Sequence, residues 1–76
     1  MITVKLYGLL RIESGIKQKQ LEAESVKEVL RHLVDCGIAK KDLEGSLILV
    51  NGAGARKQTK LKDGDLVVLM SPVAGG

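Results

Sequence analysis

The sequence contains one strong amphipathic helix pattern, and this pattern limits how the chain can fold. Apolar residues recur at i, i+3, i+4, i+7 and i+8, which predicts one apolar stripe over about three turns of helix: Val26, Val29, Leu30, Leu33 and Val34. Ser25 and Glu28 match a capping box at the helix start, and Gly37 is placed to end it. A single helix covers only one face of a sheet, so the other segments must supply that sheet.

Four other segments have the patterns of strands. Residues 2–7 alternate between apolar and polar side chains, which predicts a half-buried strand. Residues 17–22 are mostly polar, as expected for a strand at the edge of a sheet. Residues 47–50 and 66–70 are continuous apolar runs next to turn signals, which predicts two further strands, the first of them buried.

The connecting segments carry weaker signals. Residues 9–15 have the composition of a loop, and residues 39–45 form a charged connector with room for a short turn of helix. Residues 53–61 are polar and irregular, with space for a short strand near Arg56.

These segments fit one economical packing. The helix stripe lies across Ile2, Val4 and Leu6, and the first and last strands pair as parallel central neighbours. We therefore predict an α+β chain with the β-grasp (ubiquitin-like) fold, in which a mixed four- to five-stranded sheet carries one main helix on one face. Residues 1–71 form this domain, and residues 72–76 form a flexible C-terminal diglycine tail.

Composition excludes several classes of function. The 76-residue chain has one Tyr and neither Phe nor Trp, so its core must be aliphatic. A small-molecule pocket needs roughly 300 Å³ or more, which so small a domain can hardly provide, so an independent active site is not expected. The net charge is only +3 and aromatic side chains that could stack on bases are almost absent, which argues against a nucleic-acid partner.

Cysteine and histidine usage adds further limits. One His and one Cys cannot form a protein-only zinc site, so no metal is expected. Cys36 follows the helix and is expected to be a small, partly buried apolar residue. Since no apolar run could span a bilayer, we expect a cytoplasmic protein that does not bind membranes.

The last residues of the sequence are Gly75 and Gly76, reached through Pro72, Val73 and Ala74. Glycine has no Cβ, so two in succession fit a narrow channel and present a carboxylate. Fully extended, this segment reaches at most about 17 Å, enough to enter a partner while the folded domain stays outside.

Over nearly its whole length the chain resembles the MoaD/ThiS family of ubiquitin-like sulfur carriers. The resemblance is strongest in two segments, Leu61 to Val67 and Ser71 to Gly76. Pro72-Val73 before the diglycine, and Tyr7-Gly8 with Arg11 after it, are more similar to the small subunit of molybdopterin synthase than to the thiamine carrier. Two departures are that Ile12 stands where that branch often has Glu, and that the last strand lacks its usual Phe residues.

The resemblance implies a chemistry in which partners supply the active sites. An adenylyltransferase of the ubiquitin-activating type would use ATP to adenylate the carboxylate of Gly76, and sulfur transfer would then give a thiocarboxylate. That sulfur would be donated in molybdopterin (molybdenum or tungsten cofactor) synthesis, in a heteromer with the large subunit of molybdopterin synthase. The carrier itself would bind no cofactor, and four residues would contact the partner's channel: Pro72, Val73, Ala74 and Gly75.

The partner-docking surface depends on which face of the last strand points outward. Periodicity leaves both sets open, with Leu66, Val68 and Met70 on one face and Val67 and Leu69 on the other. The resemblance selects Met70 together with Tyr7 as partner contacts. Four cations are candidate charges at the rim of this surface: Arg11, Arg56, Lys57 and Lys62.

Three other functions remain open from sequence. The same chemistry could supply thiamine synthesis, cysteine synthesis or tRNA thiolation. The adenylate could instead react with an amine, making the chain a ubiquitin-like modifier joined to targets through Gly76. In a simple interaction module the tail would not matter.

Overall fold

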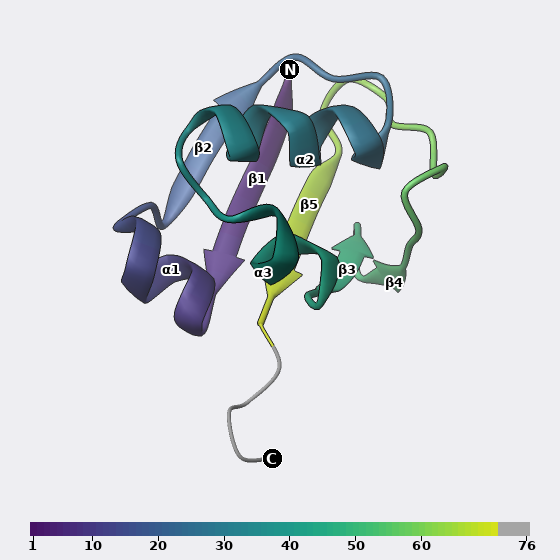
Figure 1. Ribbon diagram of the computed structural model, residues 1–76. Coiled ribbons are helices and arrows are strands. Elements are labelled where there is room, and N and C mark those ends of the chain that lie inside the picture. Colours follow the sequence, from purple (N-terminus) through teal and green to yellow (C-terminus); the bar gives the residue numbers. More distant parts are fainter. Residues whose placement is uncertain (72–76) are drawn as a thin grey trace.

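Five strands form one mixed sheet in the computed structural model, which describes residues 1–71 (Figure 1). The strand order is β2-β1-β5-β3-β4, with β1 and β5 parallel at the centre and the other pairs antiparallel. The strands are β1 (Ile2–Tyr7), β2 (Gln18–Leu21), β3 (Leu47–Val50), β4 (Ala53–Gly54) and β5 (Leu66–Met70). This is the predicted β-grasp arrangement. The predicted tail, residues 72–76, lies outside the described residues.

The main helix α2 (Val26–Asp35) crosses one face of the sheet, with the short helix α3 (Lys40–Glu44) on the same side (Figure 1). The predicted cap is present, since Ser25 Oγ accepts a hydrogen bond from the N–H of Glu28 at 3.4 Å. The Glu28 carboxylate accepts from the N–H of Glu24 at 3.2 Å, one residue earlier than in a standard capping box. Within residues 1–71, no helix is both long and apolar enough to span a membrane.

The core is aliphatic, as the composition predicts. Side chains from the inner faces of β1 and β5, from α2 and from the connecting segments bury one another. The buried residues are Ile2, Val4, Leu6, Leu10, Leu21, Val26, Val29, Leu30, Leu33, Ile38, Leu43, Leu61, Val67 and Leu69.

Two burial predictions are wrong at the C-terminal end of α2. Val34 was expected in the buried stripe, but its side chain is 40% exposed. It lies at the edge of the stripe, where α2 borders an open groove beside α3 instead of the sheet. Cys36, expected to be partly buried, is exposed, because it follows the last turn of α2 where the chain leaves the sheet.

Two connecting segments also differ from expectation. Residues 9–15, predicted as a loop, contain the short helix α1 (Leu9–Ser14), which buries Leu10. The short strand expected near Arg56 lies instead at Ala53–Gly54, where it pairs with the end of β3.

Candidate functional site

The described chain ends beside the centre of the sheet. Met70, the last residue of β5, pairs with Tyr7 at the end of β1 and with Leu47 at the start of β3. Ser71 follows immediately. Since β5 has hydrogen-bonded neighbours on both sides, the residue from which the diglycine segment departs is held by a rigid support.

A side-chain contact also fixes Ser71. Its Oγ accepts a hydrogen bond from the backbone N–H of Leu9 at 2.7 Å, so Ser71 caps the first turn of α1. Gly8 makes this approach possible, because a Cβ at that position would lie 2.5 Å from Ser71 Oγ. The φ angle of Gly8 is also positive, at 67°, a conformation that glycine adopts without strain.

The register assigns the two faces of β5. Val67 and Leu69 are fully buried beneath the helices, so the alternate residues of this strand point to the opposite side. The structure thus resolves the choice that periodicity left open: the outward set is Leu66, Val68 and Met70.

Apolar side chains cluster on this uncovered face. Residues directly opposite in adjacent strands point to the same face, so Tyr7, Met70 and Leu47 form one row. Lys5, Val68 and Leu49 form the next row on this face. Leu47 is 55% exposed and Tyr7 is 39% exposed. We call Tyr7, Leu47, Leu49, Val68 and Met70 the outer-face patch, and Lys5 lies beside it. The patch surrounds the end of β5.

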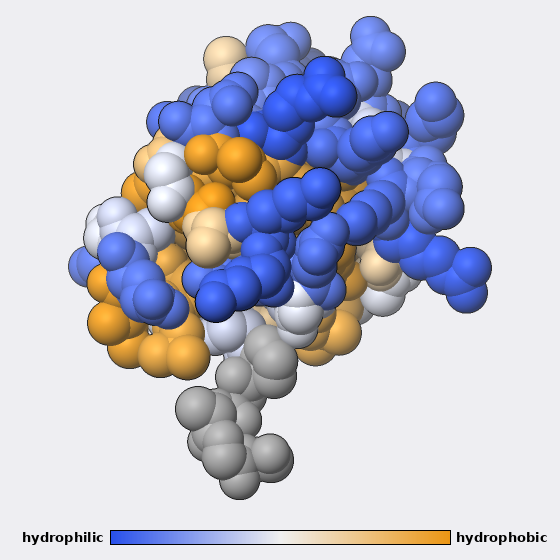
Figure 2. Space-filling view, in the orientation of Figure 1, coloured by the Kyte–Doolittle hydropathy of each residue, from blue (hydrophilic) through white to orange (hydrophobic). Residues whose placement is uncertain are grey.

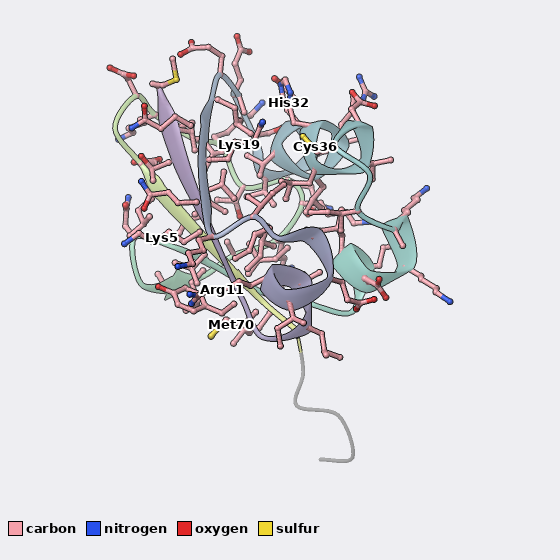
Figure 3. All side chains as sticks on the ribbon, turned by 90° about the vertical axis from the view of Figure 1, so that its left-hand side faces the viewer. Lys5, Arg11, Lys19, His32, Cys36 and Met70 are labelled. Atoms are coloured by element: carbon pink, nitrogen blue, oxygen red, sulfur yellow. The ribbon has the colours of Figure 1, made fainter. Side chains whose placement is uncertain are left out.

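The four candidate rim cations are not placed together. Figure 3 shows Arg11 with Met70 and Lys5 on the side away from His32 and Cys36 of the α2 region. Arg56 follows the edge strand β4, and its backbone N–H donates to Thr59 Oγ1 at 2.9 Å.

Two of these cations lie away from the outer-face patch. Lys57 lies on the helix side, where it pairs with Glu44 at 3.6 Å. Lys62 precedes β5 and therefore lies at the opposite end of that strand from Met70. Neither is a rim charge of the patch. Both belong to the segment between β4 and β5, which places Lys57 on the helix side of the sheet and Lys62 at the far end of β5.

Sequence reasoning missed Leu47 and Leu49 as members of this surface. The continuous apolar run of β3 is typical of a strand buried on both faces. Because the helices cover only one face of the sheet, half of the side chains of β3 lie on the uncovered face. The signal in the sequence is the same for β3 as for β5, since both are apolar on both faces and only one face is covered. No local sequence pattern indicates that Ser71 caps α1, because its hydrogen-bond partner Leu9 is 62 positions away.

A hydrogen-bonded latch fixes the other end of β5. Asn51 Oδ1 accepts from the N–H of Leu66 at 2.9 Å, while Asn51 Nδ2 donates to the Asp65 carboxylate at 2.9 Å. The N–H of Lys62 donates to the same carboxylate at 2.8 Å. The bonds to the carboxylate lower the pKa of Asp65 below its ordinary value of 3.8, and the bond from the Lys62 N–H has the larger effect.

The described residues offer surfaces and no metal centre. In residues 1–71, no three His, Cys, Asp or Glu side chains are grouped so that they could hold a metal ion. The features that stand out chemically are the outer-face patch, the fixed exit at Ser71 and the charged groove beside α3.

Comparison with known proteins identifies relatives of the whole chain. The model of the ThiS family matches residues 4–76. No protein of curated function matches the sequence.

Several solved structures have the same fold. Small archaeal modifier protein 1 (SAMP1) from Haloferax volcanii superposes with a TM-score of 0.81 at 22% identity, covering 99% of this chain and 98% of that chain. Small archaeal modifier protein 1 from Methanosarcina acetivorans gives 0.79 at 29% identity, covering 99% and 95%. A chain from the complex of subunits 1 and 2 of molybdopterin-converting factor from Helicobacter pylori gives 0.69 at 26% identity, covering 99% and 97%.

Proposed function

The chain belongs to the ThiS family of small ubiquitin-like sulfur carriers and modifiers, and from this membership we propose that it carries sulfur for molybdopterin synthesis. The supporting observation is the placement of the outer-face patch around the end of β5. A partner that covers Tyr7, Leu47 and Met70 would receive the segment that follows Ser71. The 26% identity to a chain of the H. pylori molybdopterin-converting factor supports this pathway.

The proposed chemistry starts at the carboxylate of Gly76. A carboxylate oxygen attacks the α-phosphate of ATP on an activating enzyme of the ubiquitin-activating type, and pyrophosphate leaves. A persulfide sulfur then attacks the acyl-adenylate carbon and expels AMP. A second thiol cleaves the sulfur–sulfur bond, so that a disulfide forms and the thiocarboxylate remains on the carrier.

The chain's own contribution is binding and positioning. Members of the ThiS family bind no cofactor, so the ATP belongs to the activating enzyme in this scheme. The outer-face patch supplies apolar contact area for the activating enzyme and for the large subunit of molybdopterin synthase in turn. Pro72, Val73, Ala74 and Gly75 would occupy the partner's channel and bring the Gly76 carbon to the reacting groups.

Reconstitution with the activating enzyme, ATP and a persulfide donor tests the proposal. Intact-mass measurement should show the gain of one sulfur-for-oxygen exchange, and deletion of Gly76 should abolish it. Deletion withdraws the carbon by a whole residue, and misplacement by about 1 Å can cost on the order of 100-fold in rate. Sulfur transfer to the molybdopterin precursor by the large subunit then tests the pathway.

A second function has an observation in its favour. Small archaeal modifier protein 1 from M. acetivorans is 29% identical to this chain. A modifier would use the same adenylate but pass the acyl group to a lysine amine. Covalent conjugates that appear in place of the thiocarboxylate would support this function and contradict the carrier proposal.

A further inference from the structure

A groove of about 280 Å³ lies between α2 and α3, on the opposite side of the sheet from the outer-face patch. Leu30 and Leu43 form its apolar floor, and the half-exposed Val34 forms part of one wall. Figure 2 shows apolar surface in this region, exposed between hydrophilic side chains. The exposure of Val34, which departs from the predicted helix stripe, is explained by this opening.

The rim of the groove is strongly basic. Lys27, Arg31, Lys40 and Lys57 line it, against the single carboxylate of Glu44. An adjoining hollow shares Lys27 and Lys57 and adds a further cation, Lys60. Five cations therefore line the groove and the adjoining hollow, against one carboxylate. Their local net charge of +4 exceeds the net charge of +3 on the whole chain.

Most of these cations have no partner of opposite charge in the described part of the chain. Among them only Lys57 forms an ion pair there, with Glu44 at 3.6 Å. Lys27 and Arg31 are four residues apart on α2, so two like charges repel on one helix face. An anionic ligand would remove that repulsion, because it would lie between the two side chains.

We propose that this groove binds an acidic peptide segment that carries one large apolar side chain. The apolar side chain would insert between Leu30, Val34 and Leu43, and the flanking carboxylates would pair with Lys27 and Arg31. The size of the groove suits one side chain, since enclosed drug-sized ligands need larger sites. A nucleic acid fits less well, because no aromatic side chain lines the groove for base stacking.

The groove and the outer-face patch lie on opposite faces of the sheet, so both can be occupied at once. An acidic partner held at α2 and α3 would leave Tyr7, Met70 and the exit at Ser71 accessible. This interaction does not depend on the sulfur-carrier chemistry. Its test therefore succeeds or fails independently of thiocarboxylate formation.

Amide chemical-shift mapping on the ¹⁵N-labelled full chain tests the proposal. The probe is an acidic heptapeptide of glutamates with one central leucine, compared with the same peptide carrying a central serine and with a glutamine version. The leucine peptide should shift amides of α2, α3 and residues 57–60. The serine peptide should bind at least about tenfold more weakly and the glutamine version should not bind, because each lacks one of the two contacts.

Matched variants locate the charge contribution. Lys27→Glu combined with Arg31→Glu should weaken binding of the leucine peptide by at least about tenfold. Lys5→Glu combined with Lys17→Glu changes the net charge equally but lies on the β1–β2 side, and should change the affinity less than about twofold. The same spectra report whether each variant is folded.

Three results would overturn the proposal. The first is equal binding of the leucine and serine peptides, which would reduce the interaction to charge alone. The second is equal loss of binding in the groove and control variants. The third is a short single-stranded oligonucleotide that shifts the same amides at lower concentration than the leucine peptide, which would assign the surface to nucleic acid.

Discussion

The hydroxyl of Ser71 caps helix α1 through the backbone N–H of Leu9, at 2.7 Å. A residue at the end of the described chain thus completes an element near its beginning. Together with the pairing of Met70 to Tyr7 and Leu47, this bond fixes the position of Ser71 at the end of β5.

Ser71→Ala removes this cap and leaves the Leu9 N–H without its partner. The expected loss of stability is about 1 kcal/mol, typical of one hydrogen bond. The rate of thiocarboxylate formation should fall as well, because Ser71, which precedes the diglycine segment, is no longer held by this bond. Chemical denaturation and the mass assay measure the two effects.

Ser25→Ala is the matched control for this variant. It removes the cap of α2 and should cost similar stability, but it lies far from the exit of the chain. Equal sulfur-loading rates for the two variants would show that Ser71 acts on stability alone.

Gly8→Ala should destabilise the domain through two effects. Alanine at the φ of 67° and ψ of −143° of Gly8 would enter a region that is almost restricted to glycine, at a cost of about 1–3 kcal/mol, and its Cβ would lie 2.5 Å from Ser71 Oγ. The Ser71→Ala background separates these effects, since it removes the Oγ that the added Cβ would meet. Gly15→Ala gives the smaller cost of the left-handed helical region, since Gly15 has a φ of 74° and a ψ of 3° with no atom within 4 Å of the added Cβ. Urea denaturation should show the larger loss for Gly8→Ala, and the difference should shrink when Ser71 is also alanine.

Met70→Glu and Leu69→Glu should have opposite consequences although the residues are adjacent. Met70 points to the uncovered face, so a glutamate there stays hydrated in the free protein and is desolvated only by a partner. Leu69 is fully buried, and an unpaired carboxylate in that position should unfold the domain at a cost of several kcal/mol.

Circular dichroism and binding to the activating enzyme distinguish the pair. We expect Met70→Glu to keep the wild-type melting temperature and lose partner binding. Unchanged binding by this folded variant would exclude the outer-face patch as the docking surface.

The Asp65 latch predicts a specific acid sensitivity. Because the hydrogen bonds from Lys62 and Asn51 lower the pKa of this carboxyl, its contribution to stability is present above the ordinary value of 3.8. It is lost as the pH falls from there through the lower pKa of the folded state. The difference in melting temperature between wild type and Asp65→Ala should therefore shrink in that range.

Asn51→Gly provides the control for this pH dependence. Asn51 has a φ of 52°, which glycine accepts, so the change removes the side chain without backbone strain. An NMR titration of the Asp65 carboxyl should give a pKa closer to 3.8 in this variant. An unchanged value would assign the lowering to Lys62, through its backbone N–H and its charge.

Local patterns were sufficient to predict the elements with strong periodicity. The spacing from Val26 to Leu33 and the alternation of residues 2–7 predict α2 and β1, because burial against a single partner surface imposes those periods. The bounds predicted for β3 and β5 also match the structure.

Features that depend on contacts between distant residues could not be predicted in the same way. Helix α1 has one buried residue, Leu10, and its cap comes from Ser71, so nothing local distinguishes it from a loop. The row formed by Tyr7, Met70 and Leu47 depends on register between three strands, which periodicity within one strand does not specify.

The parallel pairing of β1 with β5 also determines when, during synthesis, the protein acquires the surface that partners bind. Thr3 lies opposite Leu66, so the central pair joins almost the two extremes of the described chain and is costly to close early. A chain interrupted before Leu66 would have neither the middle strand of its sheet nor Val68 and Met70 of the outer-face patch. An incomplete translation product would therefore lack the complete outer-face patch. Only a chain translated past β5 would compete with the full-length protein for binding to partners.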